Sequence, residues 1–311
     1  MAIDVKLVNN NSELGKIFNS TYLKEGDEYI EVGIDKVILS ARFEKHYNSI
    51  ANFEVRDDDV FILAFPKSGS RWTQEMVWLI LNNLDFKTAQ ELQLDTRSPL
   101  LELETIFENI PEGYKLQDLV NYASPRCIRS HLQWSLLPKV INSGTKNPKI
   151  IVVIRGPEDT CTSYYHQAKV IEGFHGSWNQ FCTLFLGGKV PFGPYWTHLL
   201  SFWEQRHRSN IMFIKYNEMK TDLLGTIKKV ATFLGKDLSI NQIKELCIHL
   251  SFDNLKKSKG FNMEHLVKGD VNPFLRTGKV GDYKNVMDDE VIEAFGKQKE
   301  QYLSGTGITF G

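Results

Sequence analysis

The sequence has no apolar run long enough to cross a membrane. Its longest such runs, Val60 to Phe65 and Met76 to Leu81, have six residues each, whereas a membrane-spanning helix needs about 20. Asp4 and Lys6 stand near the N-terminus, where a signal peptide would have its apolar stretch. We therefore expect no membrane association and a location in the cytoplasm.

Cysteine is scarce, and the few cysteines lie far apart. Successive cysteines are separated by 34, 21 and 65 residues, so the sequence contains neither a CxxC pair nor a Cys/His cluster with zinc-site spacing. We expect free thiols of a reducing compartment that fill the core, and no bound metal. The four residues are Cys127, Cys161, Cys182 and Cys247.

An excess of positive charge is also missing. The 311 residues include 37 Lys plus Arg and 38 Asp plus Glu, which gives a formal net charge of −1. A protein that binds duplex nucleic acid usually has a basic excess, so we expect no nucleic-acid partner. With 42% hydrophobic and 24% charged residues, the composition is that of a globular protein, and any attraction for anions must be local.

No internal repeat or low-complexity linker divides the chain. Short apolar runs alternate with longer amphipathic ones, which predicts one α/β domain over residues 1–311. Strands are predicted at 60–65, 126–131, 149–154 and 211–216, and helices after residue 70, from Pro157, and at 193–208, 223–234, 239–250 and 288–303. This order predicts a doubly wound parallel sheet with helices on both faces, whose ligands bind at the carboxyl ends of the strands.

The loop after the first of these strands is typical of a phosphate-binding loop. The small residues of Pro66-Lys67-Ser68-Gly69-Ser70 let backbone N–H groups converge on an anion at a helix N-terminus. Lys67 precedes the only glycine, so the loop is not a Walker A sequence, which argues against an ordinary nucleoside triphosphatase. Taken alone, the segment fits a solvated turn equally well.

Two other stretches place basic residues at predicted strand ends or in loops. Arg155 follows the buried strand 149–154, and Ser163 lies two helical turns later. The segment 272–285 carries Arg276, Lys279 and Lys284 among glycines. Arginine suits bidentate phosphate binding, although a single arginine at a strand end is as often a surface salt-bridge partner.

Four ordered stretches, FPKSGSRW, IRSHLQ, VVIRGPEDTCTSYYH and PFLRTGKVGDYKN, resemble the cytosolic sulfotransferases. The resemblance runs from about Val60 to the C-terminus. It implies transfer of a sulfuryl group from 3′-phosphoadenosine 5′-phosphosulfate (PAPS) to the hydroxyl of a small acceptor, leaving adenosine 3′,5′-bisphosphate (PAP). It implies no metal.

The resemblance also assigns a donor site. Residues 67–71 match the 5′-phosphosulfate loop, in which Lys67 would neutralise charge on the leaving bridging oxygen. Arg155 and Ser163 match the pair that holds the 3′-phosphate, and the segment 276–278 matches the loop that closes over it. The donor-binding positions are Lys67, Ser68, Gly69, Ser70, Arg71, Trp72, Arg155, Ser163, Tyr216, Phe252, Arg276, Thr277 and Gly278.

His131 matches the family's catalytic base. It ends a predicted strand, and Arg129 lies two positions earlier on the same side of that strand. An imidazole titrates near neutrality and can take the proton of the acceptor hydroxyl as its oxygen attacks sulfur in line. The implied catalytic residues are His131, Lys67, Arg129 and Ser163.

The sequence departs from the family pattern in places. Arg71 replaces a small hydroxyl residue, and either adds a charged contact or points to solvent. Arg129 replaces the usual Lys, Gln133 a Pro, and Thr277 a common Lys. The family's C-terminal dimerisation motif has no clear counterpart, so the oligomeric state is open. Residues 1–50 match weakly, and we expect them to cover the acceptor site.

The acceptor is not fixed by these motifs. Apolar acceptors such as phenols, alcohols or sterols suit the aromatic side chains near the expected pocket, which could equally be core: Phe174, Trp178, Phe181, Phe185, Phe192, Tyr195 and Trp196. A second hypothesis is a lyase-type member that sulfates an allylic alcohol and then loses sulfate. A third is a non-catalytic nucleotide-binding module or a kinase-like phosphotransferase.

Overall fold

A parallel sheet forms the centre of the molecule in the computed structural model, which describes residues 3–8, 11–23, 28–262 and 278–311. Its strand order is β5-β4-β6-β7, and all neighbours are parallel. All of β4 and nearly all of β6 are buried, as expected for strands covered on both faces. The strands are β4 (Val60–Ala64), β5 (Cys127–Ser130), β6 (Lys149–Ile154) and β7 (Ile211–Lys215).

The strand order places a crevice beside β4. The chain passes from β4 to one neighbour, β5, and later returns to the other side of β4 as β6. Ligands of doubly wound sheets bind where the order reverses in this way, at the carboxyl ends of the strands. The loop of Lys67 follows β4 and Arg155 follows β6, so both lie at this crevice.

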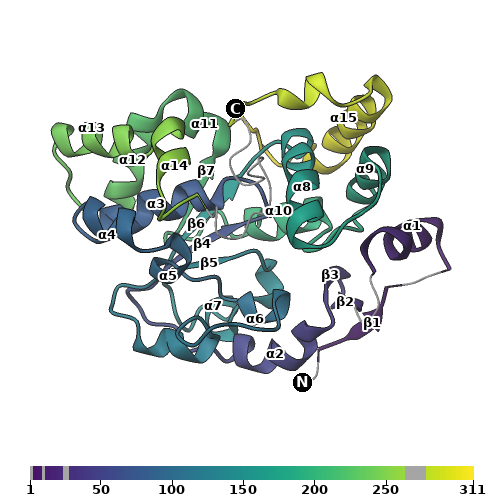
Figure 1. Cartoon of the computed structure of the whole chain (residues 1–311), viewed down its shortest axis with the longest axis horizontal. Coiled ribbons are helices and arrows are strands. Elements are labelled where there is room, and N and C mark those ends of the chain that lie inside the picture. The colour runs from purple at the N-terminus through teal and green to yellow at the C-terminus, as the bar shows by residue number, and fades with distance from the viewer. Residues whose placement is uncertain (1–2, 9–10, 24–27, 263–277) are drawn as a thin grey trace.

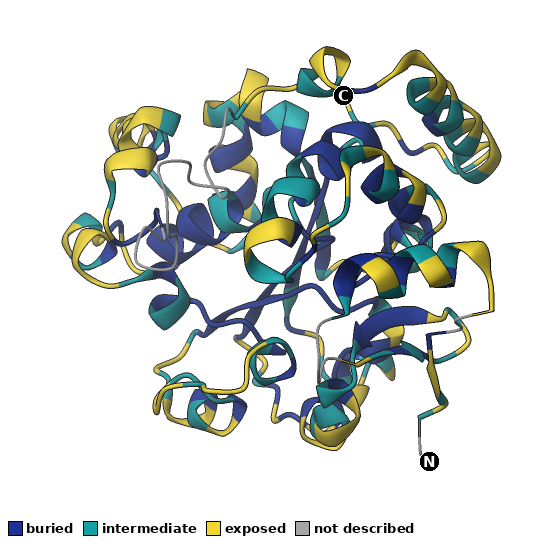
Figure 2. Ribbon diagram, turned by 45° about the vertical axis from the view of Figure 1, so that its right-hand side comes forward, coloured by how far each residue is buried: buried dark blue, intermediate teal, exposed yellow. Residues whose placement is uncertain are grey.

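Helices cover both faces of the sheet, which confirms the predicted fold class (Figures 1 and 2). Successive residues of β4 alternate between two cores, with Ile62 packed in one and Phe61 in the other. The helices with core residues on the Ile62 side are α3 (Ser70–Leu81), α4 (Phe86–Glu91), α11 (Tyr216–Thr221), α12 (Leu223–Phe233) and α13 (Ile240–His249). Those on the Phe61 side include α8 (Pro157–Ile171), α9 (Trp178–Leu186), α10 (Tyr195–Trp203) and α15 (Asp289–Leu303).

Local signals set several of these boundaries. Pro157 is the first residue of α8, where its missing N–H leaves no helical bond unmade. Ser239 and Gln242 form the capping box at the start of α13. The helix predicted over 193–208 is shorter, because α10 starts after Pro194 and residues 204–207 form turns.

A second, antiparallel sheet lies near the N-terminus, where no strand was predicted. It consists of β1 (Val5–Leu7), β2 (Tyr29–Val32) and β3 (Val37–Ser40), in that order. Two helices accompany it, α1 (Glu13–Tyr22) and α2 (Arg42–Ala51). Its buried residues join the core on the Phe61 side.

Short helical segments complete the described fold and lie mainly in the connections between strands. One of them, α5, places Asp95 and Arg97 beside α3. The segments are α5 (Leu94–Arg97), α6 (Leu103–Ile106), α7 (Lys139–Asn142), α14 (Phe252–Lys257), η1 (Leu116–Asn121), η2 (Trp134–Leu136) and η4 (Asp282–Asn285).

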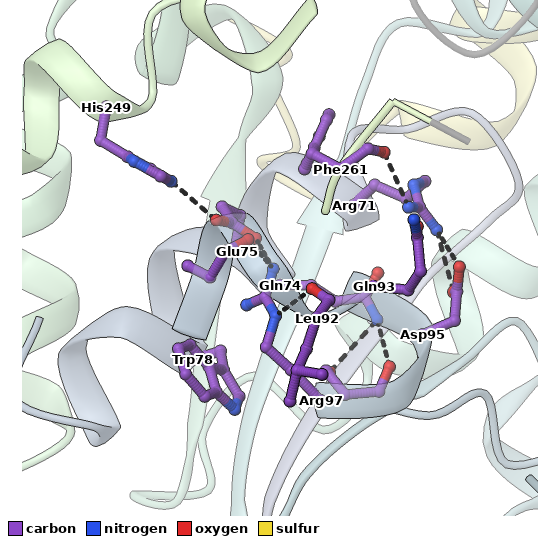
Figure 3. A network of polar contacts seen from close by, with 12 residues as sticks. Arg71, Gln74, Glu75, Trp78, Leu92, Gln93, Asp95, Arg97, His249 and Phe261 are labelled. Atoms are coloured by element: carbon purple, nitrogen blue, oxygen red, sulfur yellow. Dashed lines mark hydrogen bonds and ion pairs between the residues drawn. The ribbon is translucent and has the colours of Figure 1, made fainter. Parts of the chain in front are cut away.

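A buried carboxylate holds α3 against its neighbours (Figure 3). Glu75 on α3 accepts from Arg97 Nη2 of α5 and pairs with His249 Nε2 of α13, both at 2.7 Å. The Arg97 guanidinium also lies 4.5 Å from the ring centroid of Trp78. These contacts fix the helix that begins at the candidate phosphate loop.

A second buried ion pair joins the amino ends of β4 and β5. Asp59 Oδ1 and Oδ2 accept from Arg126 Nε and Nη2 at 2.7 and 2.6 Å, and both side chains are at most 1% exposed. Arg126 also donates to the carbonyls of Leu119 and Glu54. The pair lies at the end of the sheet opposite the crevice.

Replacing Arg126 should test how much this pair stabilises the fold. Arg126→Met leaves Asp59 buried without its partner, so we expect the free energy of unfolding to fall by about 3–5 kcal/mol. Urea denaturation of the variant and parent measures the difference. Lys297→Met, which breaks an exposed pair with Glu293, is the control and should leave the midpoint nearly unchanged. Equal midpoints for Arg126→Met and the parent would contradict the prediction.

Candidate functional site

A cavity of about 890 Å³ opens at the carboxyl ends of the central strands. It brings together residues far apart in the sequence, including the loop after β4, the end of β5 and the segment after β6. The predicted site residues that line it are Lys67, Gly69, Ser70, Arg71, Trp72, Arg129, His131, Arg155, Ser163, Tyr216, Phe252 and Gly278. Ser68 is buried, 1% exposed, and is not among the lining residues. Arg276 and Thr277 lie outside the described residues.

The loop after β4 has a strained, closely packed backbone. Lys67 has a φ of +67° and Gly69 a φ of +109°. Residues with a Cβ rarely adopt positive φ, whereas glycine adopts it readily. A Cβ at Gly69 would lie 2.8 Å from Cδ2 of Tyr216. The loop therefore requires glycine at this position for both its conformation and the packing of Tyr216.

Arg155 is held between two backbone segments at the cavity. Its Nη1 donates to the Lys67 carbonyl at 3.2 Å and its Nη2 to the Lys279 carbonyl at 3.3 Å. The guanidinium lies 4.3 Å from the ring centroid of Tyr216. Its Nε is buried and has no partner among the described residues. A fixed cation with a spare N–H donor is suited to an anionic group.

Aromatic side chains line the cavity beyond the loop. The indole N–H of Trp72 donates to the Leu250 carbonyl at 3.0 Å, and its ring meets Tyr216 edge to face at 5.8 Å. Gly278, with a φ of +62°, packs so closely on Phe252 that a Cβ would lie 2.8 Å from the ring. These surfaces offer apolar faces for a planar ring such as adenine.

Arg71 forms an ion pair in place of a solvent contact (Figure 3). Its Nη1 lies 2.8 and 2.9 Å from the two oxygens of Asp95, and its Nη2 donates to the Phe261 carbonyl at 3.0 Å. The side chain is 13% exposed, so the solvent-facing alternative is wrong. Arg129 Nη2 lies 3.5 Å from the same carboxylate, which places Asp95 between two arginines of the cavity.

His131 is oriented by a backbone carbonyl. Its Nδ1 lies 2.7 Å from the Ala64 oxygen, and because a carbonyl only accepts, Nδ1 carries the hydrogen and Nε2 keeps a lone pair. Burial, and then the charge of Arg129, lower the pKa of His131 well below 6.5. The imidazole is therefore neutral at neutral pH and able to accept a proton through Nε2.

The aromatic residues expected near the pocket are mostly core. Phe192 lines the cavity, and its ring centroid lies 5.6 Å from that of His131. The other six pack in or against the core on the Phe61 side, five of them from α9 and α10 and Phe174 from the loop between α8 and α9. Of the two alternatives that the sequence left open for them, core or cavity wall, the core placement therefore holds for these six. The apolar wall comes largely from residues that sequence reasoning missed: Tyr29, Leu39, Leu100, Leu103, Ile106 and Phe107.

Two further observations concern the described residues only. Among them, no group of three or more His, Cys, Asp or Glu side chains could hold a metal ion. None of the helices in the described ranges is long and apolar enough to cross a membrane. The four cysteines are free thiols, and three of them are buried.

Comparison with known proteins identifies the family. The sulfotransferase domain family matches residues 57–307. The chain belongs to this family. Luciferin sulfotransferase of Photinus pyralis is 38% identical over 325 aligned positions, which cover 98% of this chain and 88% of that protein. Sulfotransferase 1E1 of Bos taurus is 32% identical over 275 positions, covering 86% and 91%.

A solved structure also resembles the whole fold. The crystal structure of retinol dehydratase in complex with androsterone and inactive cofactor PAP aligns with a TM-score of 0.89 and 26% identity, covering 99% of both chains. Together these findings confirm a PAPS-dependent sulfotransferase. The fixed Arg155 with its spare N–H and the close-packed loop at Gly69 fit such a donor.

The protonation of two buried histidines, His131 at the cavity and His198 on α10, can be tested directly. Burial lowers the pKa of His198 to about 3 and, with Arg129, that of His131 well below 6.5. Below pH 6.5 the unfolded state therefore binds more protons at both rings, and each ring destabilises the fold increasingly as pH falls. In ¹⁵N-histidine NMR spectra both rings should remain neutral from pH 8 to pH 5.5. Titration of the His131 signal near pH 6.5, assigned by its loss in His131→Gln, would contradict this.

Proposed function

We propose that the protein transfers the sulfuryl group of PAPS to the hydroxyl of a small hydrophobic acceptor, with His131 as the general base. The observation that carries the proposal is one cavity in which the Lys67 loop, Arg155 and His131 meet, with the Nδ1 of His131 bonded to a carbonyl and its Nε2 left with a lone pair. The parallel sheet brings these groups together from three strand ends. We further propose that the protein works in the cytoplasm, in keeping with its free thiols.

The donor would be held by the residues at the β4 and β6 ends. The loop amides and Lys67 would hold the 5′-phosphosulfate at the start of α3. Arg155 and Ser163 would hold the 3′-phosphate, together with the segment that includes Arg276, Thr277 and Gly278. Trp72, Tyr216 and Phe252 would contact the adenine. Arg71 would act near the phosphosulfate from its position beside Asp95.

The acceptor would lie on the other side of the cavity, next to His131. Residues 1–50 would help cover it, because Tyr29 and Leu39 of the small sheet line the cavity opposite the strand ends. The aliphatic and aromatic wall favours an apolar acceptor. A phenol, an alcohol or a sterol each presents one hydroxyl on an apolar body and meets this requirement.

The chain would assist the transfer at both ends of the reacting bond. His131 Nε2 would take the proton of the acceptor hydroxyl as its oxygen attacks sulfur. Lys67 would stabilise the negative charge that develops on the bridging oxygen of the leaving nucleotide. Arg129 would keep its positive charge beside the attacked group. Ser163, on the first turns of α8, would contact the donor.

A second candidate function is net dehydration of an allylic alcohol through a sulfated intermediate. The likeness to retinol dehydratase, which extends over 99% of both chains, favours keeping it. Incubation with sulfur-labelled PAPS and a panel of phenols, sterols and allylic alcohols separates the two, since sulfation gives labelled esters and dehydration gives alkenes and free sulfate. Neither product with any acceptor would favour a non-catalytic nucleotide-binding module.

Donor binding should depend on Arg155. Arg155→Ala removes charge-assisted hydrogen bonds to the 3′-phosphate, so we expect PAP to bind roughly 10- to 100-fold more weakly. Isothermal titration calorimetry with PAP measures the change. Arg206→Ala, at an exposed site outside the cavity, is the matched control and should bind PAP like the parent. Unchanged affinity of Arg155→Ala would refute the 3′-phosphate assignment.

Turnover should depend on His131 in a way that follows the acidity of the acceptor. His131→Ala should lower kcat by roughly 10²–10⁴-fold while PAP affinity is kept, because the proton leaves only during attack. The loss should shrink for phenols that ionise near neutral pH. Lys67→Ala should be damaging whatever the acidity, because it acts on the leaving side. The measurement is kcat across substituted phenols of graded pKa, after circular dichroism shows that both variants fold. A loss in His131→Ala that is the same at every acceptor pKa would show that His131 orients the acceptor without taking its proton.

A further inference from the structure

A ladder of backbone hydrogen bonds along the edge of β5 stops next to His131. Residues 99–101 run parallel to this edge, where Arg129 N donates to the Pro99 carbonyl at 2.9 Å and Leu101 N donates to the Arg129 carbonyl at 2.8 Å. Alternate residues of a strand face the same neighbour, so the next donor on this edge is the His131 N–H. It needs an acceptor, because His131 is buried.

Glu102 supplies that acceptor through its side chain. The chain leaves the edge of β5 at Glu102 and turns into α6, of which Glu102 is the N-cap residue. Its Oε1 accepts from His131 N at 2.6 Å. The carboxyl group is fully buried and is not among the cavity-lining residues. A side-chain oxygen thus takes the place of a ladder carbonyl directly beside the candidate base.

His198 of α10 holds the other side of the same residue. Its Nε2 lies 3.1 Å from the His131 carbonyl oxygen, and this nitrogen must carry the hydrogen because the carbonyl only accepts. The ring is 2% exposed and meets Phe65 edge to face at 5.4 Å. With Nδ1 of His131 on the Ala64 carbonyl, the hydrogen bonds within the described residues leave Nε2 as the polar atom of His131 that can meet the sulfuryl acceptor.

We infer that Glu102 and His198 are positioning residues for sulfuryl transfer, which hold the peptide groups of His131 so that Nε2 stays aimed at the acceptor hydroxyl. The inference rests on the proposed role of His131 as the base. Neither residue touches the reacting atoms. A shift of about 1 Å in a catalytic group can lower a rate about 10²-fold. The hydrogen bonds of Glu102 and His198 with His131 therefore matter for turnover more than for binding.

To hold the His131 N–H, the side chain at position 102 needs an oxygen that accepts a hydrogen bond, and it does not need a charge. Burial raises the pKa of Glu102 to about 7, against the lowering effects of the His131 N–H, the Ser130 hydroxyl, its own backbone N–H and Arg129. Both the ionised and the neutral carboxyl group keep an oxygen that accepts a hydrogen bond. A glutamine amide has such an oxygen as well, whereas a methionine of similar length has none. Glu102→Gln and Glu102→Met therefore separate the hydrogen bond from the rest of the side chain.

The kinetic test compares these two variants in the full-length enzyme. Glu102→Met should lower kcat 10- to 100-fold and leave the KM for PAPS within about twofold, whereas Glu102→Gln should stay within about threefold of the parent in both. Arg126→Met is the control for lost stability, because it breaks a buried pair at the opposite end of β5. It should keep the parent kcat below its melting temperature. Parent-like turnover in Glu102→Met, or equal losses in Glu102→Met and Glu102→Gln, would overturn the inference.

A double-mutant cycle separates this inference from the proposed function. If Glu102 acts through His131, Glu102→Met should change kcat less than twofold in a His131→Ala background. An undiminished loss there would overturn the positioning role even if His131 is the base. Unchanged turnover in His131→Ala alone would refute the proposed base, and the inference would fall with it. If Glu102→Met does not fold, His198→Phe, which removes the donor and keeps a ring, takes its place in the same cycle.

Discussion

The pairing of β4 with both β5 and β6 is the constraint on which the site depends. Because the three strands are parallel and in register, their carboxyl ends lie at one edge, and the residues that follow them meet there. The Arg155 Nη1 to Lys67 carbonyl bond joins two of these ends. The Ala64 carbonyl, at the end of β4, orients His131 at the end of β5. The cavity is thus a product of strand order, and the helices on both faces hold that order rigid.

Much of this arrangement could be predicted from the sequence. Buried parallel strands read as continuous apolar runs, so β4 and β6 were evident, and Pro157 and Ser239 marked helix starts with specific backbone requirements. The acceptor wall could not be found in this way. Tyr29 and Ile106 line the cavity because of the small sheet and the path after α5, which depend on long-range packing. Conversely, aromatics such as Phe181 and Phe185 carry the same apolar signal whether they face a pocket or, as here, the core.

Arg71 shows why a motif did not give the position of a side chain. Its place in the loop puts it beside the donor site, and the sequence left a charged contact and a solvent position equally open. The outcome depended on Asp95, 24 residues later on α5, which accepts both from Arg71 and from Arg129. No sequence pattern indicated that Glu102 is buried, since a glutamate in an acidic stretch is usually solvated. It is buried because the chain turns away from the edge of β5 at this residue, so that its side chain and no backbone carbonyl accepts from the His131 N–H.

The charges of the cavity act on the base and on the acceptor together. Lys67 and Arg129 favour an anionic donor. Burial lowers the pKa of His131 most, and the same positive field lowers it further, which weakens that imidazole as a base. The field acts in the same direction on an acceptor hydroxyl, because it also stabilises the oxyanion relative to the neutral group. The proton transfer depends on the difference between the two pKa values, so the share of the lost basicity at Nε2 that the cations cause is offset at the acceptor oxygen. A weak, neutral and tightly held imidazole is therefore compatible with proton abstraction beside several cations.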